Sequence, residues 1–220
     1  MNSSRMLPTR LLNVRPSNNP DDLRLDNTKN IAANSNGNRY IALSHCWGTP
    51  DPNSPAHCTT RDNLETRETR FILDDLPKTF RDAVKVTRGL GIQYLWIDSL
   101  CIVQGTDGDW EQESWKMEQV FASAYCTVAA TSASNPNDGF LFEEVGHKGI
   151  YVQDHSNRKV YVSTIIVNFD DDVENANLNQ RAWVMQERLL SPRTIHFTSN
   201  QIYGECGEGI YAGDRIFLRR

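Results

Sequence analysis

The run Tyr40–Ser44 reads YIALS and is followed at once by HCWG, residues 45–48, so an apolar segment ends abruptly at polar residues. A short, continuous apolar run with such an ending is typical of a strand that is buried on both faces of a sheet. Two later runs have the same character: YLWI at Tyr94–Ile97, which ends at Asp98, and CTVAA at Cys126–Ala130. We therefore predict three buried strands.

Amphipathic segments separate these three strands. Pro77–Leu90 carries apolar residues at helical spacing, with proline in the first turn and glycines at the end. Trp110–Ala124 shows the same helical spacing. Strands that alternate with helices are typical of a parallel sheet with helical crossovers. The expected fold class is therefore α/β, a three-layer domain with a mainly parallel sheet in which the three runs pair in parallel.

The second half of the chain interrupts this alternation. Tyr151–Gln153 and Val160–Ile166 predict a β-hairpin insertion. Leu178–Leu190 predicts a helix, and Thr194–Thr198 and Gln201–Cys206 predict two more strands.

The segments before and after these elements carry fewer packing signals. Leu11, Leu12 and Val14 suggest a short docking segment, whereas Asn27–Asn38 and His45–Pro55 are expected to be loops. The expected organisation is a polar lead-in over 1–38, a domain over 39–206 with a hairpin insertion at about 140–177, and a tail over 207–220.

Composition argues against several function classes. The 220 residues are 39% hydrophobic and 23% charged, which is an ordinary globular balance. A net charge of -5 without a basic stripe argues against a nucleic-acid binder and a polybasic membrane anchor. No apolar run approaches the roughly 20 residues that span a bilayer, and no signal-peptide core is present at the start. We therefore expect a cytoplasmic protein, and five scattered cysteines fit that expectation.

Four segments, taken in order, carry a family resemblance. They are YIALSHCWG at Tyr40–Gly48, YLWIDSLCIVQ at Tyr94–Gln104, DWEQESWKMEQVFASA at Asp109–Ala124 and RAWVMQERLLSPRTIHF at Arg181–Phe197. Together they resemble the HET (heterokaryon incompatibility) domain of filamentous fungi, over about residues 8–206. The resemblance implies a role in programmed cell death when incompatible fungal cells fuse, together with a signalling partner protein.

HET domains in turn resemble TIR domains remotely, which implies a TIR-like or flavodoxin-like arrangement. TIR domains that cleave NAD carry a Trp and a Glu four residues apart in a pattern like WCxxEL. Trp183 and Glu187 have that spacing, which places both on one helix face, but Val184 replaces the Cys and the match is partial. The resemblance implies cleavage of the nicotinamide–ribose bond, with NAD as substrate and no cofactor. A non-enzymatic adaptor that signals by self-association is the alternative.

The motif around Glu187 supplies candidate site residues. A carboxylate at Glu187 would stabilise the positive charge that develops on the ribose as nicotinamide leaves, although a solvated helix charge is the simpler interpretation. Trp183 would stack on nicotinamide or adenine, or else pack in the core. Arg181 would bind a diphosphate, or form an ion pair with Asp98.

The strand ends supply the other candidates. Ser44 and Asp98 end predicted strands, and ligands of open parallel sheets bind just outside the carboxyl ends of strands. Asp98 could equally cap the next segment. His45, Trp47 and Gly48 follow the first strand and are expected to form a wall of the site, with Gly48 allowing close approach of the backbone.

Other chemistries have weaker support. Cys101 with His45 would make a cysteine hydrolase, but a lone cysteine after a strand is more often a packing residue. His45, Cys46, His57 and Cys58 lack the CxxC or HxxxH spacing of zinc sites, so no metal is expected. The glycines Gly89 and Gly91 precede a strand, so they do not form a phosphate-binding loop.

Overall fold

A computed structural model describes residues 6–31, 39–48, 57–141, 149–153, 159–163, 168–213 and 216–219. Within these residues ten strands form one sheet, in the order β12-β11-β10-β9-β6-β3-β5-β1-β2-β4. The strands are β1 (Arg10–Asn13), β2 (Asp22–Asn27), β3 (Tyr40–Ser44), β4 (Phe71–Ile72), β5 (Tyr94–Trp96), β6 (Cys126–Ala129), β9 (Arg193–Phe197), β10 (Ile202–Cys206), β11 (Gly209–Ala212) and β12 (Ile216–Arg219). A separate two-stranded sheet joins β7 (Gly149–Gln153) to β8 (Lys159–Ser163).

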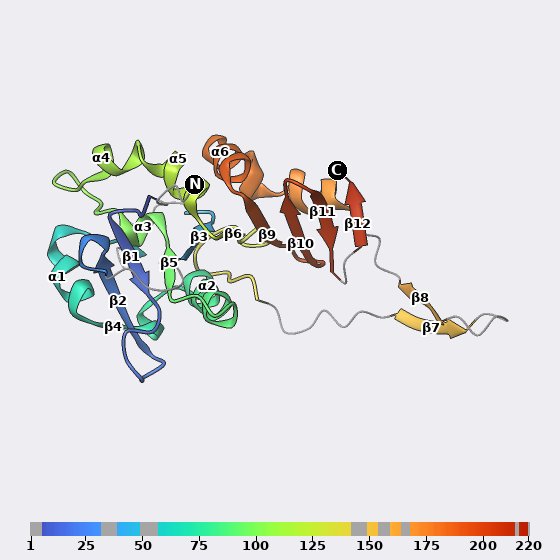
Figure 1. Cartoon of the computed structure of the whole chain (residues 1–220), viewed down its shortest axis with the longest axis horizontal. Coiled ribbons are helices and arrows are strands. Elements are labelled where there is room, and N and C mark those ends of the chain that lie inside the picture. Colours follow the sequence, from blue (N-terminus) through green and yellow to red (C-terminus); the bar gives the residue numbers. More distant parts are fainter. Residues whose placement is uncertain are drawn as a thin grey trace, which may run out of the picture.

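The described helices lie between these strands and on both faces of the sheet (Figure 1). They are α1 (Arg61–Thr69), α2 (Lys78–Gly89), α3 (Asp98–Cys101), α4 (Trp110–Ser114), α5 (Met117–Ser123) and α6 (Ala182–Leu190). Short helical turns are η1 (Thr28–Asn30), η3 (Leu73–Asp75), η4 (Asp170–Glu174) and η5 (Asn177–Gln180). None of the helices in the described part of the chain is long and apolar enough to cross a membrane.

The predicted parallel pairing of the three buried runs is confirmed. β3 pairs in parallel with β5 on one side and with β6 on the other, in a register that aligns Ile41 with both Leu95 and Cys126. β9 extends the parallel set by pairing with β6. Because parallel strands need crossover connections, the helices between them follow directly from the strand order.

The expectation of a mainly parallel sheet is wrong for the sheet as a whole. Only three of the nine pairings among its described strands are parallel, and the other six are antiparallel. The antiparallel strands flank the parallel centre on both sides. β1, β2 and β4 continue beyond β5, whereas β10, β11 and β12 continue beyond β9.

Four of the flanking strands, β1, β2, β11 and β12, come from segments expected to be a lead-in and a tail. β1 lies at the predicted docking segment and is buried throughout, while Leu23 and Leu25 of β2 are buried between polar neighbours. β11 and β12 arise from the region after Cys206. The domain boundaries at 38/39 and 206/207 remain a prediction, but residues on both sides of each belong to the same sheet.

Two apolar clusters on opposite faces of the sheet make the three layers. On one face α2 inserts Phe80, Ala83 and Val84 among side chains such as Ile41 and Leu95. On the other face, alternate residues of the same strands pack against α3 and α5. The strict alternation along β3 and β5 is what lets each strand supply both faces. The predicted three-layer α/β class is therefore confirmed.

Two predicted helices are shorter in the structure. The segment Trp110–Ala124 divides into α4 and α5 at Trp115, where the buried Glu113 binds Thr9 and Lys116, each at 2.7 Å. The segment Leu178–Leu190 divides at Arg181, whose backbone is extended. The remaining predicted elements are confirmed within one to three residues at their ends: the helix at α2, the hairpin and the strands β9 and β10. Of the expected loops, residues 32–38 and 49–56 lie outside the described residues, as do 164–166 of the hairpin.

The strand order defines one position where ligands of such sheets bind. β3 lies between β5, which follows it in sequence, and β6, which comes third, so the chain leaves β3 and β5 in opposite directions. In open α/β sheets this change of direction leaves a crevice outside the carboxyl ends of the two neighbouring strands. By this rule a ligand is expected beyond Ser44 of β3 and Ala129 of β6, which pair with each other.

Phe80→Ala should destabilise the protein by about 3–5 kcal/mol, because Phe80 is fully buried against the central strands and its loss leaves a cavity. Leu90→Ala, at the exposed end of α2, is the matched control and should change stability by less than about 1 kcal/mol. Urea unfolding measures both. Equal effects of the two substitutions would contradict the placement of α2.

Candidate functional site

A group of polar side chains gathers at the carboxyl ends of β3 and β5, and we call it the strand-end cluster. Its members are Ser44, His45, Trp47, Asp98, Arg181 and Glu187. Ser44 Oγ donates a hydrogen bond of 2.5 Å to Glu187 Oε2, and both side chains are buried. This bond fastens α6 to the end of β3, so two residues far apart in sequence occupy one place.

Asp98 organises the segment that follows β3. Its carboxylate accepts hydrogen bonds from Trp47 Nε1 at 2.8 Å and from the backbone N–H of Ser99 at 2.7 Å. His45 Nδ1 lies 3.9 Å from the same carboxylate, and the His45 ring stacks on Trp47. Asp98 therefore binds the first turn of its own helix and also holds Trp47, whereas its role toward a ligand stays a prediction.

Arg181 and Gly48 complete the arrangement around His45. Arg181 Nη1 donates to the carbonyl oxygen of His45, and no ion pair joins Arg181 to Asp98 in the described part of the chain. Gly48 adopts a left-handed conformation with φ of 72°, and a Cβ there would lie 2.9 Å from Cβ of Asn135. Only glycine fits this close approach without strain.

Burial sets the protonation of the cluster. Burial raises the pKa of Glu187 to about 7; the Ser44 hydrogen bond opposes that rise, the Asp98 charge adds to it and the Arg181 charge opposes it. Burial likewise lowers the pKa of His45, which favours a neutral ring. A carboxyl group whose pKa lies near neutrality can exchange a proton at physiological pH, as general acids and bases must.

Trp183 is not a core residue. It is 60% exposed, so the interpretation of Trp183 as a packing residue is wrong. Trp183 and Glu187 instead border a pocket of about 280 Å³ between α6 and the α4–α5 segment. Ser44, which binds Glu187, and Asp98 are not among the described residues that line this pocket.

Of the residues that line this pocket, sequence reasoning named only Trp183 and Glu187 as site residues, and it missed the exposed Trp115 and Glu118 among others. Both belong to the segment predicted as one amphipathic helix, and neither lies on its buried face. The available signal was Trp115 itself, because a large apolar residue that interrupts the polar face of a helix needs an explanation.

The chain matches the model of the family described as heterokaryon incompatibility protein (HET) over residues 40–187. It belongs to the HET family. The matched region begins at the first residue of β3 and ends at Glu187, so it spans the whole strand-end cluster. Membership connects the protein to heterokaryon incompatibility and the associated cell death. No curated protein and no solved structure matches the chain.

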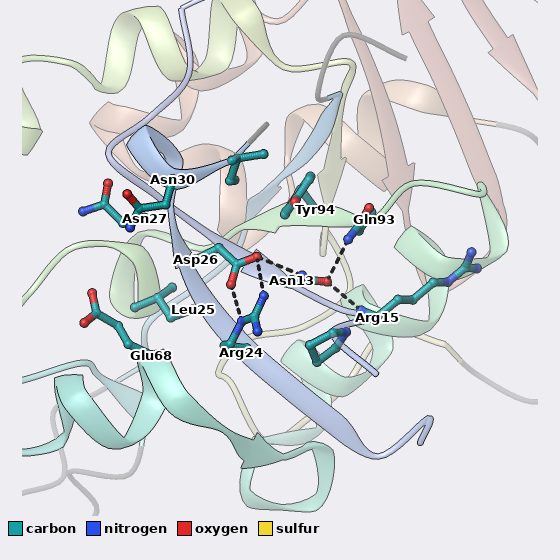
Figure 2. Close-up of a pocket in the computed structure, with 12 residues that line it drawn as sticks. Asn13, Arg15, Arg24, Leu25, Asp26, Asn27, Asn30, Glu68, Gln93 and Tyr94 are labelled. Atoms are coloured by element: carbon teal, nitrogen blue, oxygen red, sulfur yellow. Dashed lines mark hydrogen bonds and ion pairs between the residues drawn. The ribbon is translucent and has the colours of Figure 1, made fainter. Parts of the chain in front are cut away.

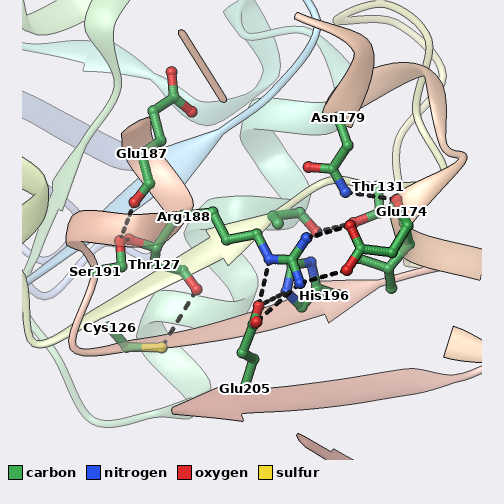
Figure 3. Close-up of polar contacts among 12 residues, drawn as sticks. Cys126, Thr127, Thr131, Glu174, Asn179, Glu187, Arg188, Ser191, His196 and Glu205 are labelled. Atoms are coloured by element: carbon green, nitrogen blue, oxygen red, sulfur yellow. Dashed lines mark hydrogen bonds and ion pairs between the residues drawn. The ribbon is translucent and has the colours of Figure 1, made fainter. Parts of the chain in front are cut away.

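A second polar network in the HET domain anchors α6 from its other side (Figure 3). Arg188 binds Glu205 of β10 at 2.6 and 2.8 Å, and Glu174 at 2.9 and 3.0 Å. His196 Nε2 lies 3.0 Å from Glu205, whose pKa falls to about 2 despite burial because His196 and Arg188 bind it. Arg188 follows Glu187 directly on α6. Its contacts with β10 therefore help to fix the position of Glu187.

The cysteine-hydrolase hypothesis does not fit the geometry. Cys101 is buried in the apolar cluster on the α5 face, and burial raises the pKa of its thiol to about 12. His45 packs against Phe80 of α2, on the opposite face. Among the residues that the structure describes, no three His, Cys, Asp or Glu side chains converge in a way that could hold a metal ion.

A larger pocket, of about 750 Å³, lies at the opposite end of the parallel strands (Figure 2). Tyr94, the first residue of β5, lines it together with Asn13, Arg24 and Asp26. These polar groups bind one another: Arg24 pairs with Asp26 at 2.5 Å, and Asn13 donates to Asp26 at 2.8 Å. Because the pocket lies at the amino end of β5, away from the carboxyl ends where ligands of such sheets bind, we do not assign the site to it.

Glu187→Gln should make the protein more stable than the parent at pH 8 but not at pH 5. The parent carboxyl is protonated in the folded state up to about pH 7, whereas its ordinary pKa is 4.5. Its contribution to stability is therefore complete below about pH 4.5 and is lost as the pH rises through 7, on the order of 2–3 kcal/mol.

Urea unfolding of the parent and the variant at both pH values measures this difference. The control is Glu111→Gln, an exposed residue on α4 outside the strand-end cluster. An equal parent-to-variant difference at pH 5 and pH 8 would show that Glu187 is ionised normally.

Proposed function

We propose that this HET domain is a cell-death effector that acts in the cytoplasm of a fungal cell and cleaves NAD at the nicotinamide–ribose bond. The observation that carries the proposal is Glu187, a buried carboxyl group at the carboxyl end of β3 that also borders an open pocket with Trp183. Buried ionisable groups with shifted pKa values that line a pocket are characteristic of catalytic sites.

The topology supports this proposal. In chain order the four parallel strands are β3, β5, β6 and β9, and their spatial order is second, first, third, fourth. Flavodoxin-like sheets have the same spatial order for their first four strands, and their ligands bind in the crevice beside the first strand. Glu187 reaches that crevice through its bond to Ser44. A TIR-like arrangement of the domain would place the ligand in the same crevice.

The chemistry needs an anion next to the ribose. The bond from ribose C1′ to the pyridinium nitrogen breaks, and its electron pair leaves with nicotinamide, which becomes neutral. Positive charge develops on C1′ and the ring oxygen, and the Glu187 carboxylate would stabilise it. Water then adds its oxygen to C1′ and releases a proton, which Glu187 can accept because its pKa is about 7. The products are ADP-ribose, nicotinamide and one proton.

The rest of the cluster would keep this carboxylate in place. Ser44 orients one oxygen, and Arg181 lowers the cost of ionisation. Arg181 donates a hydrogen bond to the carbonyl oxygen of His45. The wall formed by residues 45–48 is therefore connected to Arg181, whose charge acts on Glu187. In this proposal Ser44, His45, Trp47, Gly48, Asp98 and Arg181 position or surround the substrate, and Trp183 contacts it.

Glu187→Gln and Glu187→Ala should reduce nicotinamide release from NAD at least 100-fold and abolish cell death on expression, because Gln keeps the size of Glu but carries no charge. Parental activity should rise from pH 6 to pH 8, because the carboxylate is the active form. Nicotinamide release is measured at low and high protein concentration. The control Glu111→Gln should keep parental activity. Parental cleavage rates in folded Glu187→Gln would refute the catalytic assignment.

A second candidate function, an adaptor that signals by self-association, is favoured by the outer surface of α6. Trp183, Met185 and Leu189 are 60%, 66% and 72% exposed. Met185 and Leu189 are four residues apart and share one face of the helix, and exposed apolar side chains on one face are typical of interaction surfaces.

Leu189→Glu should then reduce self-association, because it places a charge within this apolar surface. Light scattering over a range of concentrations measures the effect, and Leu90→Glu on α2 is the exposed control. A parent protein that is monomeric throughout, or an equal effect of both substitutions, would contradict the adaptor function.

A further inference from the structure

Two exposed tryptophans border the pocket beside Glu187. Trp115, at the junction of α4 and α5, is 86% exposed, and Trp183 of α6 is 60% exposed. Tryptophan is usually well covered in folded proteins, since its exposure leaves a large apolar surface in water. One tryptophan comes from each of the two segments that border the pocket, so a flat ligand entering it would meet indole rings from both.

The charges around the pocket have one sign. Glu187 and Glu118 contribute carboxyl groups, and no Lys, Arg or His is among the described residues that line it. The remaining lining side chains are apolar or uncharged, such as Met117, Phe121 and Gln186. Such a pocket attracts a cation and repels a phosphate. Indole faces add to this preference, since their negative π surface attracts positive charge.

The size of the pocket limits what it can hold. Its volume of about 280 Å³ lies at the lower end of ligand pockets, which suits a single ring and not a whole dinucleotide. A planar cation of one ring is the class of ligand that satisfies volume, aromatic lining and charge together.

We infer that Trp115 and Trp183 bind a positively charged, planar heteroaromatic ring, with Glu118 and Glu187 as its counter-charges. The identity of that ring as the pyridinium of oxidised NAD rests on the proposed function. The pocket would then select oxidised NAD over its reduced form, whose dihydropyridine ring is neutral. Trp115 and Glu118 become substrate-binding residues that orient the scissile bond toward Glu187.

Binding of isolated rings tests this inference without requiring catalysis. Titration calorimetry and ligand-observed NMR with the full chain would compare 1-methylnicotinamide, a pyridinium cation, with neutral nicotinamide. The cation should bind at least tenfold more tightly. Trp115→Ala should weaken its binding about tenfold, as should Trp183→Ala, and Trp115→Phe should retain most of it. Glu118→Gln should weaken binding of the cation only.

Trp110→Ala is the matched control, since Trp110 lies on α4, is 41% exposed and is not among the described residues of the pocket. It should leave binding unchanged. Equal binding of the two rings, no binding of the cation, or equal loss in Trp110→Ala and Trp115→Ala would overturn the inference. Circular dichroism confirms that each variant is folded.

The outcome is separable from that of the proposed function. Cation binding that depends on Trp115, in a protein that releases no nicotinamide from NAD, would support the pocket and refute the cleavage. Cleavage of NAD with a KM unchanged in Trp115→Ala would support the enzyme and refute the role of Trp115.

Discussion

The parallel pairing of β3 with β5 and β6 is the constraint from which the rest of the molecule follows. Parallel strands run in one direction, so their carboxyl ends meet at one edge, and each return of the chain needs a crossover that covers a face of the sheet. Ser44 and Asp98 follow β3 and β5 and therefore belong to that edge. The last crossover ends with α6, which delivers Glu187 to the same edge.

The antiparallel strands have a different role, since they support the helix that carries the site. Arg188 holds α6 to Glu205 of β10, and β10 is itself paired with β9 and β11. On the inner side of the helix, Ser191 binds the carbonyl oxygen of Glu187 and the hydroxyl of Thr127 in β6 (Figure 3). Two residues that follow Glu187, Arg188 and Ser191, therefore hold α6 to different strands and fix the position of Glu187.

Sequence reasoning could predict the centre of the sheet because continuous apolar runs there are buried on both faces. It could not predict the edges, since β2 reads DLRLDN and only the alternation at Leu23 and Leu25 marks it as a half-buried strand. The association of Ser44, Asp98 and Glu187 was predictable from strand ends and from the Trp–Glu spacing. The usual burial of tryptophan misjudged Trp183, because both residues border the pocket but Trp183 is 60% exposed, whereas Glu187 is buried. Trp115 interrupts the polar face of the predicted helix, but its place beside the pocket followed only from the break between α4 and α5.

The burial of Glu187 is itself an argument about function. A carboxyl group that served only stability would gain more from full ion pairing, as Glu205 does between Arg188 and His196. Glu187 receives a hydroxyl donor and a more distant guanidinium, while burial and the Asp98 charge oppose its ionisation. Glu187 belongs to α6, whereas Glu205 of β10 binds the next residue of that helix, Arg188. The pKa of Glu187 rises to about 7, and the pKa of Glu205 falls to about 2. An environment that gives the buried Glu187 no cationic hydrogen-bond partner, while Glu205 binds Arg188 and His196, reduces stability at neutral pH, and this cost agrees with the proposed catalytic role of Glu187.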